Sequence, residues 1–297
     1  MKPHRHLMTP PLHARVYGDG ERTAVLLHGF PDDPDTFAPL LAPLVNDGWR
    51  LVVPWMRGYG LSGPAPDERY DLTTLSGDVV RLLDAVDTEK GIVIGHDWGA
   101  ATAYLAAVQH PQRIRGIATL SVPPPSTLLS RTWRHPSQLH RSRYMAQMQS
   151  PRFVERTLIP REAPLIETLW RRWSPQWNIP PERLESVRNT LAHRKCAEAA
   201  AQYYHHLLPR GPQTIREWRK TLRDAMRPIP CPGLLMTGEN DGCMDPALFR
   251  EASHAFHGEC EIHVLREVGH FLHQEDPEGV LELLRPWMKA QGKALDA

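Results

Sequence analysis

Short apolar runs alternate with segments of helical periodicity over the first 122 residues. The runs lie at 24–27, 51–53, 92–94 and 114–122, and helical spacing of apolar residues is found at 36–45, 72–86 and 100–108. Short apolar runs bounded by turn residues are typical of strands that are buried on both faces. Strands that alternate with helices favour a parallel sheet covered by helices on both sides. The sequence therefore predicts an α/β fold.

This rhythm stops at residue 123 and returns at about residue 231. Residues 123–230 show no convincing strand, and helical patterns lie at 151–158, 164–173 and 197–208. Residues 124–230 hold 19 Lys and Arg against 8 Asp and Glu, although the whole chain has a formal charge of only +1. Strands at 233–237 and 261–265 and helices at 246–256 and from 277 onward then follow. We expect one core domain of residues 1–122 and 231–297, interrupted by a helical subdomain of residues 123–230.

The composition argues against several classes of protein. A net charge of +1 gives no reason to expect a nucleic-acid partner. The four cysteines form no CxxC pair, so a disulfide framework and a zinc knuckle are both unexpected, and a reducing compartment is the simpler interpretation. No apolar run follows the basic start and no stretch approaches the ~20 apolar residues of a spanning helix. We expect a soluble cytoplasmic protein without a membrane partner; whether it forms a homo-oligomer stays open.

One pentapeptide joins a predicted strand to a predicted helix and carries a candidate nucleophile. In Gly95-His96-Asp97-Trp98-Gly99, glycines stand two residues before and two residues after an aspartate. A nucleophile elbow needs this spacing because its central residue sits in a strained turn where neighbouring side chains would clash. The usual central residue is Ser, and here it is Asp97. The alternative is a surface aspartate that caps an Ala-rich helix.

Two further residues complete a catalytic triad in the chain order nucleophile, acid, histidine. Asp241 follows the predicted strand 233–237, and His270 follows the strand 261–265. Functional sites of α/β sheets form at these carboxyl ends of strands. His273, three residues beyond His270, raises the alternative of a metal pair. No carboxylate or cysteine stands at ligand spacing, so we expect neither a metal nor a cofactor.

The tetrapeptide His28-Gly29-Phe30-Pro31 follows the first predicted strand. Gly29 permits a tight turn, and Phe30-Pro31 is a candidate cis peptide bond. The backbone N–H groups of Phe30 and Trp98 are candidates for an oxyanion hole. The alternative is a turn with no further role.

Five motifs together resemble the epoxide hydrolases of the α/β-hydrolase fold, over about residues 14–288. They are His28-Gly29-Phe30-Pro31, Arg57-Gly58-Tyr59-Gly60-Leu61-Ser62, Gly95-His96-Asp97-Trp98-Gly99, Gly238-Glu239-Asn240-Asp241 and Gly269-His270-Phe271. The resemblance implies a mostly parallel sheet flanked by helices, with residues 123–230 as an inserted helical cap. One position departs from the family pattern, because Trp55 replaces the usual Asp two residues before Arg57. This departure puts the packing beneath the His270 loop in doubt.

The resemblance also implies an activity and two further site residues. The family uses two cap tyrosines that donate hydrogen bonds to the epoxide oxygen, and the matching positions are Tyr144 and Tyr204, with Tyr203 as a neighbour of the second. The implied reaction begins with attack of Asp97 on an epoxide carbon to form an ester. His270, oriented by Asp241, then activates water, and a vicinal diol leaves. The alternative for the tyrosines is that they only pack with the cap tryptophans.

Three alternatives to epoxide hydrolysis remain. Haloalkane dehalogenases share the triad and need N–H donors for the halide; Phe30 stands where one common donor, Asn, would be, but a cap tryptophan (Trp170, Trp173 or Trp177) could replace it. Fluoroacetate-type dehalogenases use arginines where Trp98 and Ala101 stand here. A non-catalytic ligand receptor would usually have lost a triad member.

The positive charge of the predicted cap has two interpretations. It could favour anionic substrates, or the arginine-rich helix faces could simply be solvated, which is the simpler interpretation.

Overall fold

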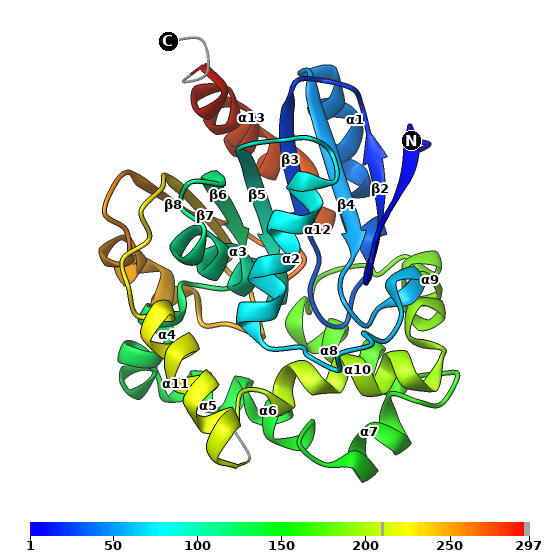
Figure 1. Ribbon diagram of the computed structural model, residues 1–297. Coiled ribbons are helices and arrows are strands. Elements are labelled where there is room, and N and C mark those ends of the chain that lie inside the picture. The colour runs from blue at the N-terminus through cyan, green and yellow to red at the C-terminus, as the bar shows by residue number, and fades with distance from the viewer. Residues whose placement is uncertain (209–210, 294–297) are drawn as a thin grey trace.

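A sheet of eight strands forms the centre of the computed structural model, which describes residues 1–208 and 211–293 (Figure 1). The strand order is β1-β2-β4-β3-β5-β6-β7-β8. Strands β1, β2 and β4 pair antiparallel and the remaining pairs are parallel, as predicted for an α/β fold. The strands are β1 (Arg5–Thr9), β2 (Leu12–Tyr17), β3 (Arg22–Leu27), β4 (Trp49–Trp55), β5 (Gly91–His96), β6 (Ile114–Leu120), β7 (Gly233–Gly238) and β8 (Cys260–Leu265).

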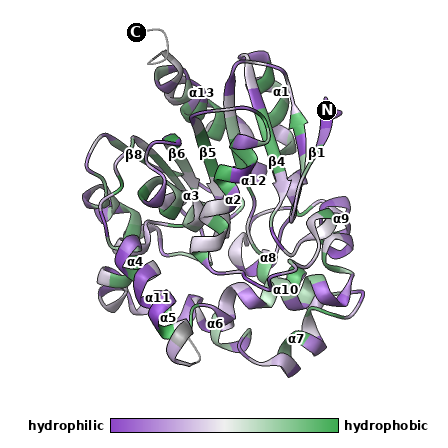
Figure 2. Ribbon diagram, viewed as in Figure 1, coloured by the Kyte–Doolittle hydropathy of each residue, from purple (hydrophilic) through white to green (hydrophobic). Residues whose placement is uncertain are grey.

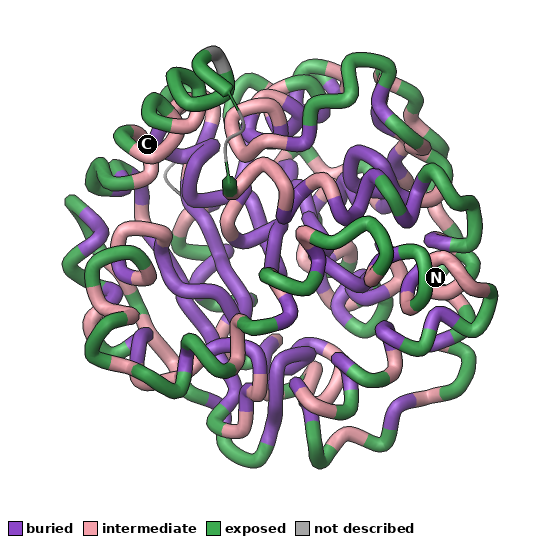
Figure 3. Tube along the Cα trace, turned by 90° about the horizontal axis from the view of Figure 1, so that it is seen from below, coloured by how far each residue is buried: buried purple, intermediate pink, exposed green. Residues whose placement is uncertain are grey.

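Helices cover both faces of the sheet, and strand β3 shows why. Successive side chains of a strand point to opposite faces. Ala24 and Leu26 accordingly pack into one hydrophobic cluster, and Val25 and Leu27 into another. The first cluster lies against α1 (Ala38–Asn46) and α13 (Pro277–Lys293), and the second against α2 (Leu72–Asp84) and α3 (Trp98–Gln109). Figure 3 shows the buried segments passing through the middle of the molecule and the exposed ones around them.

The structure adds one hairpin that was not predicted and corrects the type of one predicted helix. The β1–β2 hairpin was not predicted, although burial alternates along β2 in the way typical of a half-covered strand. The segment predicted as a helix at 246–256 is a long 3-10 helix, η4 (Pro246–Ala255), which the Asp245 side chain caps. The last helix begins at Pro277 as predicted, with the Asp276 carboxylate accepting a hydrogen bond from Gly279 N–H.

Between β6 and β7, all the regular elements that the structure describes are helices. In Figure 1 these elements lie at the end of the sheet where β5 runs into α3. They are α4 (Pro125–Arg131), η3 (Thr132–Arg134), α5 (Pro136–Arg141), α6 (Arg143–Gln147), α7 (Pro151–Thr157), α8 (Pro164–Trp173), α9 (Pro181–Leu191), α10 (Arg194–His205) and α11 (Pro212–Ala225). Hydrophilic residues dominate α11 (Figure 2). This arrangement supports the proposed division into a core and a cap of residues 123–230.

No helix among the described residues has the length and apolar character needed to cross a bilayer.

Candidate active site

Asp97 occupies a strained turn between β5 and α3. Its backbone has φ 50° and ψ −115°, a conformation that non-glycine residues rarely adopt. A Cβ atom on Gly95 would collide with the Gly99 carbonyl, and one on Gly99 with the Leu27 carbonyl, so both positions require glycine. Asp97 is buried and its side chain makes no capping hydrogen bond to α3. The alternative of a surface capping residue is therefore wrong.

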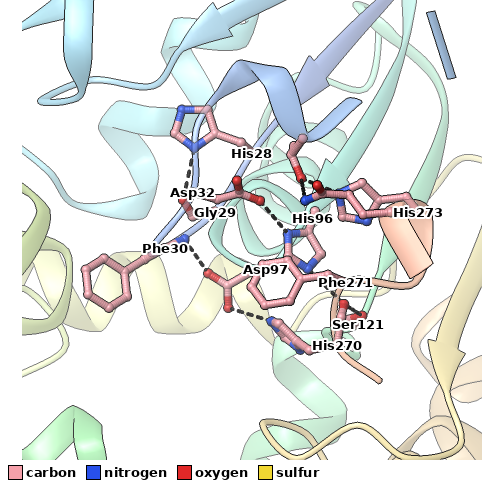
Figure 4. Close-up of polar contacts among 12 residues, drawn as sticks. His28, Gly29, Phe30, Asp32, His96, Asp97, Ser121, His270, Phe271 and His273 are labelled. Carbon is pink, nitrogen blue, oxygen red and sulfur yellow. Dashed lines mark hydrogen bonds and ion pairs between the residues drawn. The ribbon is translucent and has the colours of Figure 1, made fainter. Parts of the chain in front are cut away.

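His270 lies between the carboxylates of Asp241 and Asp97, and Figure 4 shows the Asp97 side. Its Nδ1 lies 2.9 Å from Asp241 Oδ2, and its Nε2 lies 3.7 Å from Asp97 Oδ2. Asp241 Oδ1 accepts hydrogen bonds from the backbone N–H groups of Cys243 (2.7 Å) and Met244 (2.9 Å). Because Nδ1–H donates to Asp241, Nε2 faces Asp97 as the atom able to exchange protons there, and it has no hydrogen-bond partner.

These charges shift the pKa values of both partners. Burial alone would raise the pKa of Asp97, but the contact with the His270 imidazole outweighs it and the pKa is lowered. Burial alone would lower the pKa of His270, but the charges of Asp241 and Asp97 outweigh it and the pKa is raised. Asp97 is therefore ionised at neutral pH and needs no base to become a nucleophile.

The loop after β3 holds one oxygen of Asp97. Phe30 N–H donates to Asp97 Oδ1 at 2.9 Å (Figure 4), and the Phe30–Pro31 peptide bond is cis as predicted. A Cβ atom on Gly29 would overlap the Asp97 carboxylate, so this approach requires glycine. Trp98 is the first residue of α3, where N–H groups have no partner within the helix. Both predicted oxyanion donors thus adjoin Asp97.

The structure separates the two neighbouring tyrosines of α10. Tyr203 OH donates to the Arg57 carbonyl at 2.7 Å, so this hydroxyl is occupied. Tyr204 OH is buried without a hydrogen-bond partner. The Tyr204 ring contacts those of Phe30 and Trp98, each at 5.3 Å between centroids, and that of Tyr144 at 5.6 Å. Tyr144 and Tyr204 thus lie together beside the elbow, whereas the Tyr203 hydroxyl is bonded to the Arg57 carbonyl.

Burial and the negative charge of nearby Asp97 raise the pKa of Tyr204 well above its ordinary value. The pKa of Tyr144 is also raised, through burial and the proximity of Cys243 and Tyr204. Both phenols therefore keep their protons at neutral pH and are hydrogen-bond donors.

Comparison with known proteins shows the family to which this chain belongs. A family profile described as the alpha/beta hydrolase fold matches residues 24–277. The chain belongs to the alpha/beta hydrolase fold family.

Several proteins similar to this chain are named epoxide hydrolases. Epoxide hydrolase 4 of Mus musculus is 28% identical over 278 residues, which cover 92% of this chain and 74% of the relative. Epoxide hydrolase A of Mycobacterium tuberculosis is 37% identical over 126 residues, 42% of this chain and 38% of the relative. The crystal structure of Epoxide Hydrolase A from Mycobacterium thermoresistibile aligns with a TM-score of 0.73 at 26% identity, covering 95% of this chain and 97% of that one.

Two cap tryptophans of this α/β hydrolase differ in what their indole N–H groups do. Trp170 Nε1 donates to the Pro31 carbonyl at 2.8 Å, and so ties α8 to the loop that carries Phe30. Trp173 Nε1 is buried without a partner. The Trp173 ring packs against those of His270 (5.0 Å) and Tyr144 (5.1 Å). Among the predicted halide-binding candidates, Trp173 therefore has a free donor next to the triad.

Cys243 adjoins the three residues of the predicted triad, and sequence reasoning missed it. Its sulfur lies 3.9 Å from Tyr144 OH, and it forms a group with Asp97 and His270 whose ligand-type atoms are all within 4.8 Å of one another. The available signal was its position two residues after Asp241, in the turn whose N–H groups hold that carboxylate.

Trp55, which replaces the aspartate usual in the family, was expected to affect the packing beneath the His270 loop, but it lies beside β2. Trp55 packs against β2, with the Arg15 guanidinium 4.4 Å from its ring and the His13 ring at 5.6 Å. Close to the His270 loop, His96 Nε2 lies 3.0 Å from the His270 carbonyl and Ser121 Oγ donates to the same carbonyl. Hydrogen bonds from N–H groups of the loop to Ser174 and Glu275 add to these polar contacts.

The predicted reaction centre is closed in this conformation. Asp97, His270, Tyr144 and Tyr204 are all at most 3% exposed. A cavity of about 340 Å³ lies elsewhere, near Thr23, Trp49 and Lys90. This cavity lies at the N-terminal ends of β3, β4 and β5, whereas Asp97 follows the C-terminal end of β5, so we do not assign the reaction to the cavity. Substrate entry to Asp97 therefore requires cap side chains to move.

Proposed function

We propose that this protein hydrolyses epoxides to vicinal diols through a covalent ester on Asp97. The observation that carries the proposal is the pair of protonated, buried phenols, Tyr144 and Tyr204, next to an ionised carboxylate in an elbow. Opening an epoxide creates an alkoxide that needs a proton, and a phenol supplies it. The relatives named epoxide hydrolase support the same activity. The substrates would be a small epoxide and water.

The first step uses the two oxygens of Asp97 differently. Oδ1 is held by Phe30 N–H, whereas Oδ2 has no backbone donor and faces His270. Oδ2 attacks an epoxide carbon, the carbon–oxygen bond of the ring breaks, and the departing oxygen takes a proton from Tyr144 or Tyr204. The product is an ester in which Oδ1 is the carbonyl oxygen.

The second step needs His270 as a base. Esterification removes the negative charge of Asp97, one of the two charges that raise the pKa of His270. The imidazole then loses its proton more readily while Asp241 keeps it oriented. His270 takes a proton from water, hydroxide attacks the ester carbonyl, and the N–H groups of Phe30 and Trp98 stabilise the oxyanion. The new carboxyl group of Asp97, which carries the oxygen of the water, gives its proton to the released alkoxide, so the diol leaves and Asp97 is again ionised. The proton that His270 lost after the first step restores the hydroxyl group of the tyrosine.

A second candidate function is haloalkane dehalogenation, and one observation favours it. The indole N–H of Trp173 is buried beside His270 without an acceptor, which suits a departing halide. Epoxide opening makes no demand on this group. The same attack by Asp97 Oδ2 would then expel halide in place of an alkoxide.

A paired assay separates these activities. Wild type and Asp97→Asn are given a panel of terminal and internal epoxides and a panel of chloro- and bromoalkanes, with diol formation and halide release as readouts. We expect diol formation that is lost in Asp97→Asn. Halide release without diol formation would favour the dehalogenase. Stabilisation by a small apolar ligand without any turnover would favour a receptor.

A further inference from the structure

Three buried groups of different chemistry meet at the elbow. A carboxylate oxygen of Asp97, an imidazole nitrogen of His270 and the sulfur of Cys243 all lie within 4.8 Å of one another. His270 is 0% exposed and its Nε2 has no hydrogen-bond partner. The proposed hydrolysis uses Asp97 and His270 but gives no role to the Cys243 thiol.

We propose that Asp97, His270 and Cys243 form an inhibitory binding site for a zinc-like divalent cation. Carboxylate oxygen, imidazole nitrogen and thiolate sulfur are the three ligand types that zinc takes in proteins. His270 Nε2 and Asp97 Oδ2 are 3.7 Å apart, close to the roughly 3.3 Å that separates two such ligands on a tetrahedral zinc ion. A modest shift of the thiol completes three ligands and leaves the fourth position for water.

The groups around the site already orient its ligands. Asp241 accepts from His270 Nδ1, which fixes the ring with Nε2 toward the site, as a second carboxylate does for many metal-binding histidines. Phe30 N–H holds the other oxygen of Asp97. Metal binding requires the Cys243 thiol to lose its proton, which is released to solvent.

Occupation of this site would occupy the nucleophile and the base at once. Asp97 could not attack and His270 could not accept a proton, so the metal and the substrate would exclude each other. The binding itself does not rest on the proposed epoxide activity, because it can be measured without any substrate.

A second buried group offers an alternative location for a metal. Ligand-type atoms of Asp32, His96 and His273 also lie within 4.8 Å of one another, with His96 Nδ1 3.9 Å from Asp32 Oδ2. This group, visible in Figure 4, contains no sulfur. Softer metals prefer the thiolate, so we place the cation at Cys243.

Cobalt(II) titration of the whole protein tests the site. Cobalt bound to a thiolate gives a charge-transfer band in the near ultraviolet, which a nitrogen and oxygen site lacks. We expect this band in wild type, its loss on addition of zinc, and its absence from Cys243→Ser and Cys243→Ala. Binding to these variants should weaken about tenfold or more, because even indirect partners of metal ligands contribute that much.

Two matched variants serve as controls. Cys231 is buried just before β7, at the end of that strand opposite Asp241, so Cys231→Ala should keep the band. His273→Gln removes a member of the sulfur-free group and should keep it too. A wild type without the band, a band retained in both Cys243 variants, or binding lost only in His273→Gln would overturn the proposal.

Discussion

The chemistry of single residues at this site depends on how close the charges of Asp97 and Asp241 lie to one imidazole. Both raise the pKa of His270, but only one of them disappears when the ester forms. In the proposed mechanism, the free enzyme would therefore keep an ion pair suited to nucleophilic attack, and the esterified enzyme would gain a better base. The same ring would serve both steps because its surroundings change between them.

Asp241→Asn tests this account through pH dependence. His270 must be neutral to activate water, so ester breakdown is lost as pH falls below the pKa that His270 has in the ester. Asparagine removes the remaining charge that raises this pKa. The pH below which ester breakdown slows should therefore move to a lower value. The maximal rate should fall roughly 10²-fold or more because the ring loses its orientation. Decay of the adduct in single-turnover experiments at several pH values measures both effects; an unchanged pH dependence would contradict the account.

Tyr204→Phe and Tyr203→Phe form a matched pair on one helix. Tyr204→Phe removes a free phenol beside Asp97, and we expect roughly 10²-fold slower ester formation. Tyr203→Phe removes the donor to the Arg57 carbonyl, and should cost about 1 kcal/mol of stability with little change in rate. Stopped-flow ester formation and urea denaturation distinguish the two. Equal rate losses in both variants would argue that the tyrosines only pack.

At the scale of elements, helix α9 is joined to the loop that carries Phe30. Arg183 of α9 donates to Asp32 at 2.8 Å, to Asp33 at 3.0 Å and to Gln274 at 3.0 Å. Asp32 is 0% exposed, and burial raises its pKa to about 7 in spite of Arg183. The ion pair thus holds the cap on the core at the oxyanion loop.

Arg183→Gln should lower the free energy of unfolding by about 3–5 kcal/mol at alkaline pH, because a buried carboxylate loses its partner. The pKa of Asp32 in the folded protein is raised to about 7, so below that pH the side chain is protonated and needs no cationic partner. Part of the loss caused by Arg183→Gln should therefore disappear below about pH 7. Arg285→Gln is the control, since Arg285 pairs with Asp47 at the surface and should matter little. Urea denaturation at two pH values gives the comparison; equal, small losses would argue against the clamp.

Much of the core could be predicted from sequence, because its signals are local. The strands that end at His96 and Gly238 are short apolar runs, and the elbow glycines are required by backbone contacts within a few residues of Asp97 or on the neighbouring strand β3. Contacts with the cap could not be predicted in this way. Arg183 and Asp32 are 151 residues apart in the chain, and no local pattern connects them. The same holds for Cys243 beside Tyr144, which meet only through the packing of α6 on the turn after β7.

At the scale of the whole molecule, burial is unevenly distributed between the sheet and the outer cap. Strands β5 and β7 are buried throughout, whereas α5 and α6 each bury one residue and α11 has none among its described side chains. Segments with few buried contacts open locally at low free energy. Because the reaction centre is closed, such opening in the cap is the route by which substrate would enter.

Hydrogen exchange measured under native conditions tests this distribution. We expect amides of α5, α6 and α11 to exchange faster than those of β5 and β7, through openings well below the global free energy of unfolding. Protection of the cap helices equal to that of the strands would show that the cap does not open independently.

The most direct test of the central claim is intact-protein mass spectrometry of His270→Gln mixed with a small terminal epoxide. The variant keeps the nucleophile but lacks the base for the second step. We predict that protein heavier by one substrate mass accumulates, and that peptide mapping places the added mass on Asp97. Asp97→Asn, treated in the same way, should remain unmodified. No adduct in His270→Gln across a panel of reactive epoxides, or an adduct on another residue, would contradict the assignment of Asp97 as the nucleophile.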